Sequence, residues 1–174
     1  MFEESIENHI RECLVGDAQK HASDFVAYLR AQGMLFERGA GYWADKRYWM
    51  IGTQGKYVCF MLINGQGALR HPDEHEGWIV WSDDSGEDRF ADAPLDERMK
   101  ETAWKHLDFC GHCGGVCDGG TRRIVFGKAF DQICRTAFRF DNPGAEEIAC
   151  MKELARLSAF NIDREAAQAI KGFQ

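Results

Sequence analysis

The sequence predicts an α+β fold, a mainly antiparallel sheet with helices packed on it and a cysteine-rich loop that binds metal. Three observations support this prediction: helical spacing of apolar residues at the N-terminus, short strand-like runs joined by turns further on, and a length typical of one domain. The chain has 174 residues, 45% of them hydrophobic and 28% charged, and no repeat or linker divides it. We therefore expect a single domain over residues 1–174, with a helical pair in residues 1–33 and the sheet, further helices and cysteine loop in residues 34–174.

Two helices are expected at the N-terminus. The first spans residues 2–15, and the second follows Asp17, its expected N-cap, and ends at Gly33, since glycine commonly closes a helix. The apolar faces that predict them consist of Phe2, Ile6, Ile10, Cys13 and Leu14 in the first helix, and of Ala22, Phe25, Val26 and Leu29 in the second.

Strands are predicted over residues 34–37, 48–51 and 56–64, and a turn at residues 53–55 joins the last two into a hairpin. The third of these strands lacks polar alternation, so both of its faces should be covered. After a polar loop, another strand with apolar residues on both faces is expected over residues 78–81.

Helices and strands are both predicted in the C-terminal half. Pro94 opens a helix that reaches residue 109, and strands follow over residues 123–126 and 137–140. Residues 142–144 then start a helix, and a separate short helix is expected from Asp163. The residues expected to be buried in the former are Ile148, Met151, Leu154 and Leu157.

Residues 110–120 carry the most informative pattern, because three of the seven cysteines lie within eight residues there. Cys110 and Cys113 are separated by two residues, a spacing that turns two sulfurs toward one tetrahedral ion, and Cys117 adds a third sulfur. The intervening glycines let the backbone curl tightly. Cys134 follows Cys117 after sixteen residues, within the usual separation of zinc ligand groups. We therefore predict a structural zinc site at Cys110, Cys113, Cys117 and Cys134.

Other interpretations of this cluster stay open. His112 and His106 are alternative fourth ligands, and His106 is expected one helical turn before Cys110, on the same helix face. The thiolates can also hold an iron–sulfur cluster, since spacing alone does not select the metal. A dithiol redox site is a further alternative, because Cys-Gly-His-Cys resembles the active-site tetrapeptide of protein disulfide isomerases, although the glycines here would break the helix that such a site needs. The simplest interpretation is a loop of reduced thiols. The other cysteines are expected in the core: Cys13, Cys59 and Cys150.

Aromatic residues gather on or beside the predicted sheet. They are expected to form its core, with the alternative that tryptophans wall a pocket for a flat or apolar small molecule. Strand alternation places Trp78 and Trp81 on opposite faces, so the sheet has more apolar surface than one core needs. An interaction module that docks a partner protein is a third possibility. The predicted pocket residues are Trp43, Trp49, Trp78 and Trp81.

Composition and motifs exclude several classes of function. The net charge of −7 and the absence of a basic cluster argue against a nucleic-acid partner. No apolar run is long enough for a membrane span, and the acidic N-terminus does not resemble a secretory signal, so a cytoplasmic protein is expected. The run from His71 to His75 matches an inverted zinc-protease motif, but Pro72 and its polar surroundings oppose the helix that this chemistry requires. No other catalytic signature is found, which favours a non-enzymatic protein.

The last two-thirds of the chain resembles small uncharacterised bacterial α+β domains. The resemblance is carried by three segments, GKYVCFMLINGQGAL, RRIVFGKAF and FRFDNPGAEEIACMKELARL. Some of these domains stand alone, and some are regarded as the effector-binding part of regulators. The resemblance implies an α+β fold and brings no catalytic residues. The helix-turn-helix that such regulators carry is not evident here, because the first two helices are acidic.

Overall fold

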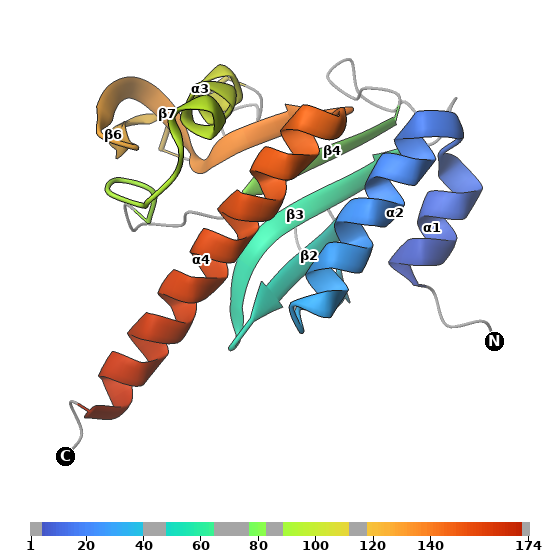
Figure 1. The fold of residues 1–174 in the computed structure, drawn as a ribbon, viewed down its shortest axis with the longest axis horizontal. Helices are drawn as coiled ribbons and strands as arrows, with labels where there is room; N and C mark the ends of the chain where they lie inside the picture. The colour runs from blue at the N-terminus through green and yellow to red at the C-terminus, as the bar shows by residue number, and fades with distance from the viewer. Residues whose placement is uncertain (1–4, 40–47, 65–76, 83–88, 112–117, 172–174) are drawn as a thin grey trace.

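A computed structural model describes residues 5–39, 48–64, 77–82, 89–111 and 118–171. These residues form an α+β fold with one antiparallel sheet and four helices packed on it (Figure 1). The described strands are β1 (Leu35–Arg38), β2 (Tyr48–Thr53), β3 (Lys56–Asn64), β4 (Gly77–Ser82), β5 (Leu107–Phe109), β6 (Thr121–Val125) and β7 (Lys128–Asp141). Their order is β1-β2-β3-β4-β7-β5, and β6 pairs with β7.

The two N-terminal helices are α1 (Ile6–Cys13) and α2 (Gly16–Ala31). α2 begins one residue before Asp17, so the predicted N-cap is wrong; Asp17 lies in the first turn, where a carboxylate interacts favourably with the helix dipole. Gly33 has a φ of +74° just beyond the end of α2, as expected for a glycine that follows a helix.

The β2–β3 hairpin forms where it was predicted. Its turn residues Gln54 and Gly55 have φ angles of 52° and 71°. Two consecutive left-handed residues are typical of the type I′ turn, whose twist matches that of the flanking strands.

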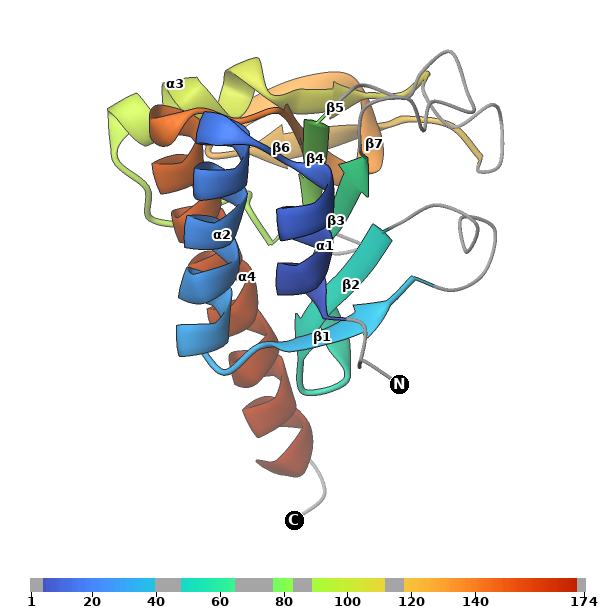
Figure 2. The ribbon, with the colours of Figure 1, turned by 90° about the vertical axis from the view of Figure 1, so that its right-hand side faces the viewer.

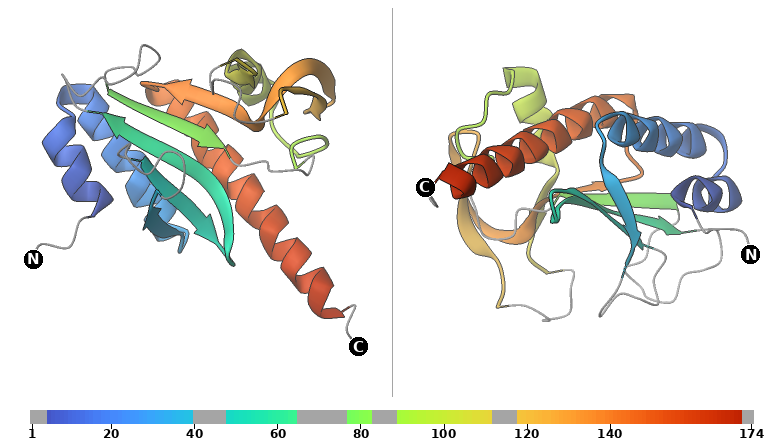
Figure 3. Two further views of the ribbon diagram at one scale, coloured as in Figure 1. Left: turned by 180° about the vertical axis from the view of Figure 1, so that it is seen from behind. Right: turned by 90° about the horizontal axis from the view of Figure 1, so that it is seen from below.

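The two faces of the sheet differ in what covers them. Helices α1, α2 and α4 (Ala145–Lys171) pack on one face (Figure 3, right). A cross-strand row on that face is fully buried, with relative exposures of 3% or less; it consists of Trp49, Met61, Val80 and Phe140. The neighbouring row on the opposite face is only half-buried and consists of Met50, Phe60, Trp81 and Arg139.

Three elements of the C-terminal half differ from the predictions. α3 (Glu97–Lys105) is shorter than predicted at both ends, because Asp96 caps its start and residues 107–109 form β5. β7 is much longer than the predicted strand over 137–140. α4 is one continuous helix, so the separate helix from Asp163 is wrong; residues 145–171 contain no glycine or proline that would end it.

The described residues divide into two regions, a helix-covered body and a distal lobe. The helix-covered body comprises α1, α2, β1–β4 and α4. The distal lobe comprises residues 89–111 and 118–138, with α3, β5, β6 and most of β7, and it lies at one end of the sheet (Figure 2). No helix in the described part of the chain is long and apolar enough to cross a membrane.

Candidate metal centre

Both ends of the cysteine segment, residues 110–120, meet one residue of β7. Phe109, just before the segment, and Thr121, just after it, both pair with Ile133 from opposite sides of β7. Ile133 directly precedes Cys134. The topology of the distal lobe therefore brings the start of the segment, its end and Cys134 to one place.

The base of this segment is closed by tight backbone contact. The Cys110 amide donates to the Gln132 carbonyl at 2.8 Å. A Cβ atom on Gly120 would lie 2.5 Å from the backbone of Gln132 and 2.8 Å from the Cβ of Cys110. Real Cβ atoms do not approach so closely, so Gly120 is a position where only a glycine fits.

Cys134 lies in an irregular part of β7. Leu107 pairs with Phe138, and Phe109 pairs with Ile133, so the single residue Asp108 on β5 faces four residues of β7. These four form a bulge, defined here as Cys134, Arg135, Thr136 and Ala137. Positive φ angles occur just before and within the bulge, at Gln132 (61°) and Ala137 (58°).

Hydrogen bonds from both neighbouring strands hold this bulge. The Thr136 hydroxyl donates to the Asp108 carboxylate at 2.6 Å. On the other side, the Ser82 hydroxyl donates to the Thr136 carbonyl and accepts from the Phe138 amide. Asp108 and Ser82 are 6% and 8% exposed, so these bonds are sheltered from water.

The sequence alone did not identify Asp108, Thr136 or Gly120 as parts of this region. One signal for Asp108 was present, because this acidic residue stands between the apolar residues Leu107 and Phe109. The tight contact of Gly120 had no local signal, since it depends on a residue of β7.

Two of the four predicted zinc ligands lie in the described residues. Cys110 and Cys134 are both half-buried; Cys110 directly follows β5, and Cys134 lies on the adjacent strand β7. Cys113 and Cys117 lie outside the described residues, as does His112. Within the described ranges, no three His, Cys, Asp or Glu side chains are grouped closely enough to hold a metal ion. The predicted His71–His75 motif also lies outside the described residues.

The expected relation between His106 and Cys110 is wrong. α3 ends at Lys105, and the extended chain of β5 separates the two residues. The His106 ring stacks on Phe140 with a centroid distance of 4.4 Å, and its Nε2 lies 3.8 Å from Glu147 of α4. In this position His106 faces the helix layer.

The cysteines of the helix-covered body are core residues. Cys59 and Cys150 are 4% and 1% exposed, and Cys13 packs against the core while half-buried. Burial raises the pKa of the Cys150 thiol to about 12, and carboxylates such as Asp96 and Glu147 add to the effect. A thiol of this kind stays protonated and unreactive at neutral pH.

The described tryptophans of the predicted pocket are divided between the two faces of the sheet. Trp49 and Trp78 are 3% and 1% exposed on the helix-covered face, where the Trp49 indole donates to His9 Nδ1 at 3.2 Å. Trp81 lies half-buried on the opposite face, beside Phe60. Trp43 lies outside the described residues. Trp49 and Trp78 thus have contacts typical of core residues.

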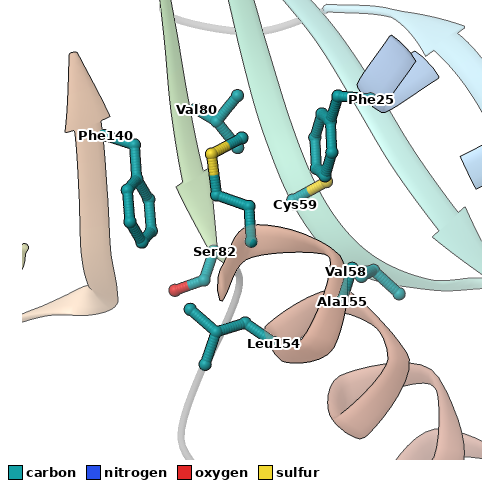
Figure 4. Close-up of a pocket in the computed structure, with 9 residues that line it drawn as sticks. Phe25, Val58, Cys59, Val80, Ser82, Phe140, Leu154 and Ala155 are labelled. Atoms are coloured by element: carbon teal, nitrogen blue, oxygen red, sulfur yellow. The ribbon is translucent and has the colours of Figure 1, made fainter. Parts of the chain in front are cut away.

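A small pocket lies between the sheet and α4 (Figure 4). Its volume is about 20 Å³, enough for a single water molecule rather than an organic ligand. Its lining is apolar apart from the Ser82 hydroxyl, which is already bonded within the protein. The lining residues are Phe25, Val58, Cys59, Val80, Ser82, Phe140, Met151, Leu154 and Ala155.

Comparison with known proteins found no matching family model, no similar curated protein and no similar solved structure. The function must therefore be inferred from the chemistry of the chain itself.

Proposed function

We propose that the protein is a zinc-binding domain in which Cys110, Cys113, Cys117 and Cys134 hold one structural ion. The observation that carries this proposal is the pairing of Phe109 and Thr121 with Ile133, because it puts both ends of the cysteine segment beside Cys134. Four thiolates around one ion are one of the usual ligand sets of structural zinc sites in proteins.

Chain connectivity supports the same set of ligands. Cys113 follows Cys110 by three residues, and Cys117 precedes Gly120 by three. Since Cys110 and Gly120 are in contact, both cysteines are tethered to one anchor. Three steps along the chain, each of about 3.8 Å between consecutive Cα atoms, limit how far either cysteine can reach from that anchor.

The role of the ion is to stabilise the distal lobe. β5 and β6 are short, and only part of their apolar surface is buried. Leu107 and Val125 are buried, whereas Phe109 and Ile124 are 51% and 47% exposed. A metal that joins the segment to β7 supplies stability that packing here does not.

Metal analysis of the purified full chain tests the proposal. We expect one zinc per chain, two or more orders of magnitude weaker binding for Cys110→Ser or Cys134→Ser, and no change for the matched control Cys13→Ser. Visible absorbance bands would instead indicate an iron–sulfur cluster. Disulfide reductase activity that depends on Cys110 and Cys113 would indicate a redox protein. A metal-free protein whose four site thiols all react with Ellman's reagent under native conditions would overturn the proposal.

Binding of a small ligand on the face of the sheet opposite the described helices is a second candidate function. Phe60 and Trp81 are paired there and half-buried, and the Arg139 guanidinium lies 5.6 Å from the centroid of the Trp81 ring. Arg139 also bonds to Asp141 at 3.0 Å, which fixes its orientation. A flat aromatic surface with an adjacent cation suits a planar aromatic anion.

Titration with 8-anilinonaphthalene-1-sulfonate tests this second candidate. We expect saturable binding that is weakened at least tenfold by Trp81→Ala and by Arg139→Gln. Trp104→Ala, a half-buried tryptophan of the distal lobe, serves as the control and should leave dye binding unchanged. Equal binding by all four proteins would contradict a site at Trp81. A stable dimer in solution whose dissociation exposes Trp81 would favour the interaction module instead.

A further inference from the structure

The position of Cys134 requires more than regular strand geometry. It lies in the four-residue bulge opposite Asp108, close to two non-glycine residues with left-handed backbone, Gln132 and Ala137. Such backbone persists only where the surrounding structure holds it. The contacts that hold the bulge therefore also determine where the Cys134 sulfur lies.

Asp108 provides the link between Cys110 and Cys134. It lies on β5, two residues before Cys110, and accepts the hydrogen bond from Thr136, two residues after Cys134. Its carboxylate thereby ties β5, which directly precedes Cys110, to the bulge that contains Cys134. A carboxylate that is 6% exposed is costly to bury, and an apolar side chain would serve packing alone better.

We propose that Asp108 is the positioning residue of the metal site: through Thr136 it holds the β7 bulge so that Cys134 stays beside Cys110. This inference rests on the proposed zinc function. Asp108 acts through the geometry of the bulge rather than as a ligand, because its carboxylate is directed to the Thr136 hydroxyl. The Ser82 hydroxyl fixes the same residue from the other side, through its carbonyl.

Paired substitutions separate positioning from general stability. Thr136→Val removes the donor while preserving shape, and Thr136→Ser restores a hydroxyl. Asp108→Asn keeps an acceptor oxygen without the charge. Thr102→Val is the matched control, since Thr102 is also buried but bonds to Arg98 within α3 at 3.2 Å.

Zinc affinity is measured by competition with the chelator 4-(2-pyridylazo)resorcinol, and cobalt(II) absorption reports the geometry of the site. We expect Thr136→Val to lower zinc affinity about 10–100-fold, as loss of outer contacts does at other metal sites, and to alter the cobalt spectrum. Thr136→Ser, Asp108→Asn and Thr102→Val should remain within about threefold of the wild type. Unchanged affinity and an unchanged spectrum in Thr136→Val would overturn the inference.

A metal-free measurement distinguishes this inference from the zinc proposal. In a protein with Cys113→Ser and Cys117→Ser, diamide oxidises Cys110 and Cys134 to a disulfide and is itself reduced to the hydrazine. We expect Thr136→Val to slow this reaction at least fivefold, as followed by peptide mass spectrometry. A wild-type protein that binds no zinc would overturn the zinc function, whereas an unchanged rate of disulfide formation would overturn the role of Asp108.

Discussion

The helix-covered body and the distal lobe share one sheet but are stabilised differently. In the body, side chains between the sheet and the helices are 1% exposed or less; examples are Trp78 and Ile63 on the sheet and Phe25 on α2. In the lobe, a small cluster around Phe90 and Phe138, with ring centroids 5.0 Å apart, is the apolar centre. The lobe also contains the bulge of β7 and buried charged side chains, Asp108 and Arg123. Apolar burial thus stabilises both regions, and the lobe adds specific hydrogen bonds at its bulge.

Removal of a large side chain from the body should have the largest effect. Trp78→Ala is expected to lower the free energy of unfolding by about 3–5 kcal/mol, because it removes a fully buried aromatic ring. Urea denaturation followed by circular dichroism measures the change. Trp81→Ala, on the half-buried face, should cost about 1–2 kcal/mol. Equal losses would show that the two faces are equally buried.

Metal removal should affect the lobe and spare the body. With free zinc at 100 times the dissociation constant, the ion contributes about 2.7 kcal/mol to the free energy of unfolding. After chelation, hydrogen exchange is expected to speed up in β5, β6 and residues 128–136, while α2 and β3 stay protected. A uniform change across the chain would contradict the division into two regions.

Addition of one methyl group at the base of the cysteine segment should have the next largest effect on the free energy of unfolding. Gly120→Ala is expected to cost about 1–3 kcal/mol and to weaken zinc binding, since the new Cβ would lie 2.5 Å from the backbone of Gln132. The control is Gly127→Ala, where the space is open but φ is +79°. It should cost about 1 kcal/mol through backbone strain and leave zinc affinity unchanged. Calorimetry and metal titration measure both quantities.

At neutral pH the smallest effect is that of the buried Cys150 thiol, because it appears only as the pH becomes alkaline. Since burial raises the pKa of Cys150 from 9.0 to about 12, the unfolded chain loses this proton at a lower pH than the folded chain. The contribution of this protonated thiol to the free energy of unfolding is therefore fully present below about pH 9. It is lost as the pH rises toward 12, by about 1.4 kcal/mol per pH unit. Cys150→Ala should have a flatter stability profile between about pH 9 and 10.5. Parallel profiles for the two proteins would contradict the raised pKa.

Sequence patterns predicted the body better than the lobe. The apolar spacing of the first two helices and the hairpin turn at residues 53–55 are local signals, and both led to correct elements. Residues 128–136 of β7 are mostly polar and half-exposed, so no periodicity marked them as a strand. The helical pattern before Cys110 was extended too far, because nothing in the segment itself indicates that residues 107–109 pair with β7.

The candidate site depends partly on local sequence spacing and partly on long-range strand pairing. The spacing of Cys110, Cys113 and Cys117 was sufficient to predict a metal site, since ligand geometry within a short loop depends on neighbours in the chain. The place of Cys134 beside that loop depends on the pairing of Phe109 and Thr121 with Ile133.

The sequence by itself determined the α+β class, the helical pair and the central hairpin, and it supplied the prediction of the cysteine site. These features follow from the periodicity of side chains along a helix or strand and from the conformations that particular turn residues prefer. Only the tertiary structure decided the bulge opposite Asp108, the need for glycine at position 120 and the meeting of Cys110 with the strand of Cys134. Each of these depends on hydrogen bonds or contacts between segments that are distant in the chain, and no local pattern specifies which segments will pair.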